Sequence, residues 1–79
     1  MDIQLSERVV ASNDVLHGKP RIAGPRVPVF YVLRLLASGK SIDEIISDQY
    51  YPELAREDVL ACLTYASHLV EMDDFVAVL

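Results

Sequence analysis

Short apolar stretches alternate with turn-forming residues over the first 28 positions of the chain. Residues 8–12 are rich in β-branched side chains and precede Asn13 and Asp14, so a short strand followed by a turn is expected there. Glycines and prolines recur through residues 15–28 and exclude a regular helix. A second short strand is expected around residues 21–23.

Helical signals follow, and they begin at Pro28, a residue that the first turn of a helix tolerates. Residues 29–37 are almost wholly apolar, and Gly39 is a natural left-handed stop, so the first helix should be buried on most of its surface. Ser41 and Glu44 have the spacing of a capping box and predict the start of a second helix.

A third helix is expected from about residue 56 to about residue 71, with Glu57 and Asp58 in the first turn, where the helix dipole favours acids. One apolar stripe repeats along it at helical spacing. Its members are Val59, Cys62, Leu63, Ala66, Leu69 and Val70. Leu60 and Met72 lie off this stripe, so a second face is partly apolar and indicates burial in a dimer.

The last seven residues are two acids followed by five apolar side chains, which is unusual in a terminal segment. Such a segment can dock on a core, pair with a second subunit or bind a partner. The candidate partner-binding residues are Phe75, Val76, Val78 and Leu79. We expect a single domain over residues 1–79, with a hairpin or loop arm at 8–28, a three-helix core at 29–72 and an apolar tail at 73–79.

Size and composition narrow the class of protein. A chain of 79 residues with 52% hydrophobic residues is one small ordered domain, and so apolar a composition at this length favours a homodimer. Cys62 is the only cysteine, so no intrachain disulfide forms. No apolar run is long enough for a membrane helix and no signal-peptide core is present, so a cytoplasmic location is expected.

The net charge of −5 is unevenly distributed. Residues 1–40 carry six basic and three acidic side chains (+3), whereas residues 41–79 carry one basic and nine acidic side chains (−8). A polyanion-facing first half is one interpretation, and helix-dipole complementarity with solvated faces is the other. On the first interpretation the candidate DNA contacts are the cations of a stretch without acids, Lys19, Arg21, Arg26, Arg34 and Lys40.

Catalytic and metal-binding patterns are weak in this sequence. His17, His68 and Cys62 have neither metal-ligand spacing nor the spacing of a nucleophile and its base, so we expect no enzyme, no cofactor and no metal. Two helices joined by a turn after a buried first helix are compatible with helix-turn-helix packing. The third helix is nevertheless a poor reader of DNA, because after Arg56 it has no Arg, Lys, Asn or Gln through Glu71.

Residues 18–29, GKPRIAGPRVPV, resemble the GKPxIxGTRxPV signature of a bacterial and archaeal family known as domain of unknown function four hundred thirty-three. Residues 36–39, 41–46, 51–54 and 57–66 agree with the same family in the same order. Pro25 stands where the family usually has Thr. Ala55 replaces a Thr or Ser cap, a change expected to cost about 1 kcal/mol.

The resemblance implies a mainly α fold, a three-helix, homeodomain-like helix-turn-helix bundle with a short N-terminal β-hairpin. It also implies an antitoxin-like protein of a type II toxin–antitoxin pair, which binds a PIN-like nuclease. Antitoxins of this kind often repress their own promoter, so binding of operator DNA is a further option that the resemblance leaves open. An intruding Arg21 or Arg26 would then occupy the carboxylate site of the nuclease. The alternative is a stand-alone helix-turn-helix regulator that binds DNA.

Overall fold

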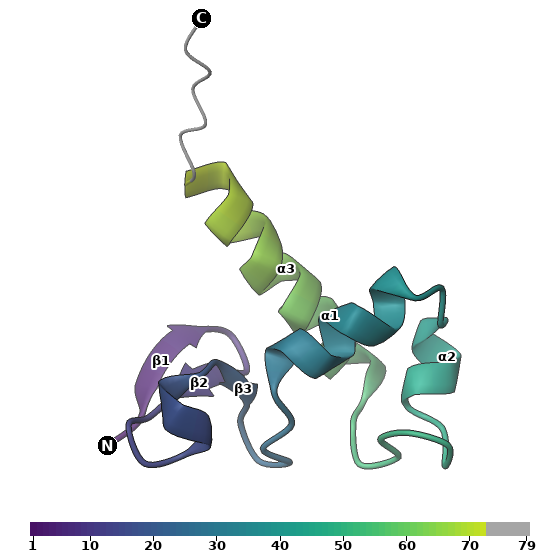
Figure 1. Cartoon of the computed structure of the whole chain (residues 1–79), viewed down its shortest axis with the longest axis horizontal. Coiled ribbons are helices and arrows are strands. Elements are labelled where there is room, and N and C mark those ends of the chain that lie inside the picture. Colours follow the sequence, from purple (N-terminus) through teal and green to yellow (C-terminus); the bar gives the residue numbers. More distant parts are fainter. Residues whose placement is uncertain (73–79) are drawn as a thin grey trace, which may run out of the picture.

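A computed structural model describes residues 1–72 of the chain (Figure 1). The expected partner-binding residues Phe75, Val76, Val78 and Leu79 lie outside this described part. The elements follow in the order β1 (Ile3–Ser6), β2 (Val9–Ala11), the 3₁₀ helix η1 (Leu16–Gly18), β3 (Arg21–Ile22), α1 (Val29–Ala37), α2 (Ile42–Ile45) and α3 (Arg56–Met72).

The three strands form one antiparallel sheet in the order β1-β2-β3. Ile3 pairs with Ala11, and Val9 pairs with Ile22. Strands β2 and β3 lie where the sequence predicts them, whereas β1 was not predicted. The side chain of Ile3 is exposed, so β1 contributes backbone pairing to the edge of the sheet more than it contributes to the core.

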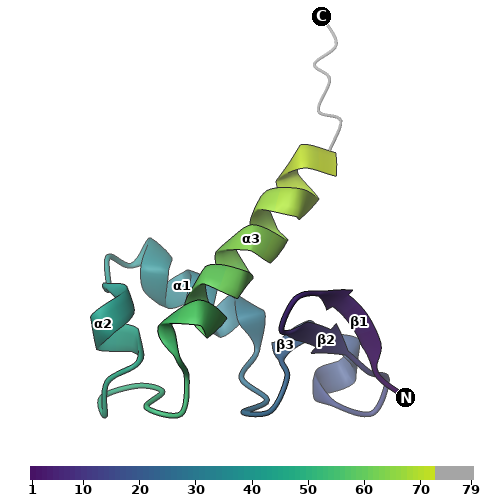
Figure 2. The ribbon, with the colours of Figure 1, turned by 180° about the vertical axis from the view of Figure 1, so that it is seen from behind.

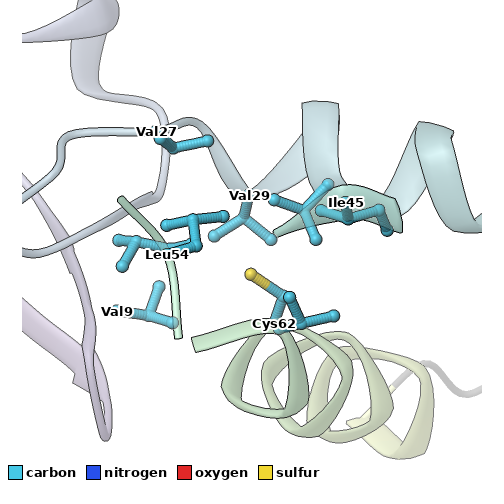
Figure 3. Close-up of a cluster of buried hydrophobic side chains, with 9 residues drawn as sticks. Val9, Val27, Val29, Ile45, Leu54 and Cys62 are labelled. Atoms are coloured by element: carbon cyan, nitrogen blue, oxygen red, sulfur yellow. The ribbon is translucent and has the colours of Figure 1, made fainter. Parts of the chain in front are cut away.

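The expectation of a mainly α three-helix bundle is wrong, because the sheet forms a full part of the core. Helix α2 has only four residues, and the buried cluster draws on strands and loops as well as helices (Figure 3). Its members are Val9, Ile22, Val27, Val29, Val32, Ile45, Leu54, Val59 and Cys62. The chain is therefore a mixed α and β domain, with the sheet at one end and α2 at the other (Figures 1 and 2).

Helix α2 ends after Ile45 because nearby polar groups close a turn after it. The Ser47 hydroxyl donates to the Glu44 carbonyl at 2.6 Å and accepts from the Gln49 N–H at 3.2 Å. The Tyr51 N–H then donates to the Ile45 carbonyl at 2.9 Å. These bonds satisfy the backbone groups that a longer helix would have paired internally.

The predicted helix signals for α1 and α2 are confirmed in detail. Helix α1 occupies the predicted residues, and Gly39 follows it with a φ of 95°. The capping box is complete, since the Glu44 N–H donates to Ser41 Oγ at 3.1 Å and the Ser41 N–H donates to Glu44 Oε1 at 2.9 Å. The bond from the Ser41 N–H lowers the pKa of the Glu44 carboxyl.

Asp58 fixes the start of α3 and ties it to the sheet. Its carboxylate accepts a hydrogen bond from the Ala55 N–H at 2.8 Å, which is one of the two bonds of a capping box. The second bond is absent because the alanine side chain has no acceptor for the Asp58 N–H. The other carboxylate oxygen lies 2.9 Å from the Arg8 guanidinium in the turn between β1 and β2. This ion pair raises the pKa of Arg8. One buried carboxylate thus joins two elements that lie far apart in the sequence.

Helix α3 runs past the rest of the domain. Its first half packs against α1 and the sheet, while its C-terminal end projects beyond them in two opposite views (Figures 1 and 2). The predicted apolar stripe is therefore buried at Val59 and Cys62 but exposed at Leu69 and Val70. No helix within residues 1–72 is long and apolar enough to cross a membrane.

Candidate functional site

The five candidate cations do not form one cluster, but two of them meet at Phe30. The Lys19 Nζ lies 5.9 Å and the Arg34 Cζ 5.2 Å from the centroid of the Phe30 ring, both within cation–π range. Phe30 and Arg34 are four residues apart on α1, a spacing that places them on one face. The Val29 N–H donates to the Pro20 carbonyl at 3.1 Å and so holds the segment that carries Lys19 against the start of α1.

These side chains line an open groove of about 520 Å³ between α1 and α3, which we call the α1–α3 groove. The apolar part of its wall comes from Leu33 and Val29 on α1 and from Leu69 on α3. The remaining lining residues are Lys19, Pro20, Phe30, Arg34 and Tyr65. No acidic side chain of the described chain lines it, so the groove is apolar at its base and cationic along its rim.

A second groove continues this surface on the other side of Arg34. Its lining combines Arg34 with three tyrosines, Tyr31, Tyr50 and Tyr51. The Tyr51 side chain is half-buried against the core, and desolvation raises the pKa of its hydroxyl. This agrees with a role for Tyr51 as an anchor of the turn between α2 and α3, while the surface beside it is aromatic and cationic.

Arg21 has a structural role. It is only 4% exposed, its Nη1 donates to the Ser12 hydroxyl at 3.2 Å, and its Nη2 lies 3.4 Å from the Asp2 carboxylate. Its buried Nε has no partner within residues 1–72. A guanidinium held in this way is not presented to a phosphate or to a carboxylate of another molecule, so Arg21 does not belong to the α1–α3 groove.

The other two cations lie apart from the groove. Arg26 is exposed on the turn between β3 and α1, where its φ of 64° places it in the left-handed region. Lys40 is half-buried after α1, and its backbone N–H donates to the Leu35 carbonyl at 3.0 Å as part of the helix end. The structure therefore brings together only Lys19 and Arg34 of the candidate set.

The comparison with known families then decides the relationship of this chain. A family described as "Protein of unknown function (DUF433)" matches residues 9–66. The chain belongs to the DUF433 family. No curated protein and no solved structure matches it.

The DUF433 match contains all five candidate cations, Phe30 and Tyr65, but it stops before Leu69, so one of the two α3 residues that line the groove lies beyond it. The sequence did not indicate Phe30, Leu33 and Tyr65 as groove-lining residues, because they lie in apolar helical runs that are typical of a core. The available signal was the four-residue spacing of Phe30 and Arg34, which places an aromatic ring and a cation on one face of a helix.

Cys62 is the only thiol of this DUF433 chain, and it is buried in the core beside Val29 and Ile45 (Figure 3). Desolvation, followed by the nearby Asp58 carboxylate, raises the pKa of the thiol to about 12. A nucleophilic cysteine requires the opposite, a lowered pKa and access to solvent. The position of Cys62 is therefore that of a small core residue.

Cys62 is expected to be inert in the folded protein. With a pKa of about 12, only about one thiol in ten thousand is ionised at pH 8, and the core blocks the reagent. Ellman's reagent at pH 8 should show no fast reaction, and one thiol per chain should react at once after addition of urea to a denaturing concentration. A fast reaction without urea would contradict the buried position of the thiol.

Proposed function

We propose that this DUF433 chain is a binding protein and not an enzyme, the antitoxin-like partner of a PIN-like nuclease in a type II toxin–antitoxin pair. The observation that carries the proposal is the α1–α3 groove, in which Lys19 and Arg34 have no carboxylate partner within residues 1–72 although the chain has a net charge of −5. Nucleases of this class use clustered carboxylates, so a cationic rim on an apolar base complements an acidic partner.

The groove is suited to hold a carboxylate without a large loss of side-chain freedom. Phe30 restrains Lys19 and Arg34 before any partner arrives, and this lowers the entropy cost of ordering two long side chains. The Arg34 guanidinium can accept a carboxylate in bidentate geometry. Leu33 and the ring of Phe30 supply apolar surface that is buried on contact, which is the usual composition of the centre of an interface.

Arg26 provides the second contact in this proposal. Arg26 lies on an exposed turn, so its guanidinium can reach beyond the surface of the domain. Of the two arginines that the sequence suggested for the carboxylate site of the nuclease, Arg21 and Arg26, only Arg26 is exposed. An arginine placed among the nuclease carboxylates would compete with the divalent ion that they bind. The binding protein then neutralises the nuclease by occupying its acidic site.

The proposal requires a nuclease-like protein encoded beside this chain, and the test is co-expression of a tagged chain with that neighbour. Wild type should retain the nuclease on the resin, and the double variant Lys19→Glu/Arg34→Glu should weaken the complex about a hundredfold, since two attractive contacts become repulsive. The control Lys40→Glu/Arg56→Glu makes the same change of charge outside the groove and should retain the nuclease. Equal loss in both double variants would contradict a role of the groove.

Binding of operator DNA is a second candidate, favoured by the exposed and unpaired Lys19, Arg26 and Arg34 within the described chain. The start of α3 is unsuited to the task because it presents Glu57 beside Asp58. Contacts from three cations predict that the logarithm of the affinity falls with the logarithm of salt concentration at a slope of about −3. A mobility shift with the upstream DNA at several salt concentrations measures this slope, and no shift at low salt excludes this candidate.

A further inference from the structure

The core-facing side of α3 continues into solvent. Cys62 is fully buried, while Leu69, seven residues later and on the same side of the helix, is 48% exposed. Met72 lies one turn beyond Leu69 and is 77% exposed. The apolar stripe that is buried at Cys62 is therefore exposed at Leu69, and Met72, which lies off this stripe, adds a second exposed apolar side chain where the end of α3 projects from the domain (Figures 1 and 2).

A hollow of about 440 Å³ lies at the base of this projecting half, on the side of the sheet. Leu5 of β1 forms one wall and the end of α3 forms the other. We call this region the α3-end surface, and its residues are Leu5, Tyr65, His68, Leu69, Glu71 and Met72. It combines a projecting apolar ridge with an apolar hollow beside it.

We infer that a second copy of this chain covers the α3-end surface, with the two α3 helices packed antiparallel about a two-fold axis between Leu69 and Val70. A two-fold contact requires one surface that is complementary to itself. Here the ridge at Leu69 and Met72 of one copy fills the hollow beside Leu5 of the other, and the reverse contact forms at the same time.

The charges of the α3-end surface agree with self-association. It carries one acid, Glu71, and the imidazole of His68, a hydrogen-bond donor for a carboxylate, whereas the α1–α3 groove carries two cations and no described acid. An antiparallel pair centred between residues 69 and 70 places His68 of each copy beside Glu71 of the other. The cations of the α1–α3 groove take no part in this contact, so they stay available for an acidic partner.

The length of the exposed stripe explains why the contact must include the sheet. Tyr65 to Met72 spans about 12 Å at 1.5 Å per residue, only two helical turns. Two turns form a small contact for a stable dimer, whose interfaces usually bury about 800 Å² on each partner. Leu5 extends the apolar surface from the helix onto β1.

Sedimentation equilibrium of the isolated full chain tests the inference. Wild type should have twice the mass of one 8.8 kDa chain, and Leu69→Asp should have the mass of a single chain, a weakening of at least a hundredfold. Leu60→Asp is the matched control, because Leu60 is 46% exposed on the same helix but nine residues away and so on the opposite side. This control should remain dimeric, and circular dichroism should show both variants folded.

A charge exchange across the contact distinguishes loss of the dimer interface from loss of the fold, because a second substitution restores the contact. His68→Glu places like charges together twice in the dimer and should weaken it about tenfold, and the further change Glu71→Lys should restore it. A monomeric wild type at high micromolar concentration, or equal dissociation by Leu60→Asp, would overturn the inference. If the chain is a monomer alone and the α3-end surface becomes buried only when a nuclease is added, that surface binds the nuclease and the inferred dimer is wrong. Because only the isolated chain is used, failure here leaves the proposed nuclease binding untouched.

Discussion

Replacement of Arg21 with alanine is expected to lower the free energy of unfolding by about 2 to 4 kcal/mol, a large part of the stability of so small a domain. The side chain is 4% exposed, so its aliphatic part is packed and its loss opens space in the sheet. The Ser12 hydroxyl, 3.2 Å from the guanidinium, would also lose its partner in a buried position. A buried polar group without a partner costs about 1 to 3 kcal/mol.

Urea unfolding followed by circular dichroism measures this effect. The control is Arg26→Ala, the same chemical change on an exposed turn, which should alter the free energy of unfolding by less than about 0.5 kcal/mol. Arg21→Met keeps part of the packing and should fall between the two. Equal midpoints for Arg21→Ala and Arg26→Ala would show that Arg21 does not support the fold.

Asp58→Ala should destabilise the protein by about 2 kcal/mol through the start of α3. The variant loses the bond from the Ala55 N–H, a cap contribution of about 1 kcal/mol, and removes a negative charge from the first turn of the helix, worth about 0.3 to 1 kcal/mol. It also leaves Arg8 without the partner that joins the β1–β2 turn to α3. The thermal midpoint should fall by roughly 8 to 16 °C for a domain of this size.

Glu57→Ala is the matched control for this prediction. Glu57 precedes Asp58 in the same turn and has the same charge, but it is exposed and makes no described hydrogen bond or ion pair. Its loss should change the midpoint little. If the two variants melt at the same temperature, general helix-dipole effects and not the specific contacts of Asp58 would govern the start of α3.

Local signals in the sequence predict the helices well. The stop at Gly39 and the capping box of Ser41 and Glu44 each depend on residues within a few positions, and the structure confirms them. The length of α2 could not be predicted, because the Tyr51 N–H that pairs with the Ile45 carbonyl comes from the following loop. Strand β1 was missed because its Ile3 side chain is exposed and gives no core signal. The fold class was wrong because β2 and β3 contribute Val9 and Ile22 to the buried core and because α2 has only four residues.

The residues of the candidate site are harder to predict from the sequence than the helices are, because tertiary packing brings them together. The cations of residues 19–40 form one run along the chain, but pairing in β3 turns Arg21 into the core, while Arg26 stays exposed. The α1–α3 groove joins Phe30 to Leu69, almost forty residues later, and no local pattern connects them. A double replacement of Arg21 and Arg26 would therefore combine a folding effect with a binding effect.

Inhibition of ribonuclease activity tests the central proposal most directly. The proposal requires a PIN-like nuclease encoded beside this gene. RNA cleavage by that nuclease should fall to background when one equivalent of the wild-type chain is added. The Lys19→Glu/Arg34→Glu variant should leave cleavage close to its uninhibited rate, while Lys40→Glu/Arg56→Glu should inhibit like wild type. Full cleavage in the presence of excess folded wild-type chain would contradict the proposal that this DUF433 protein neutralises a nuclease.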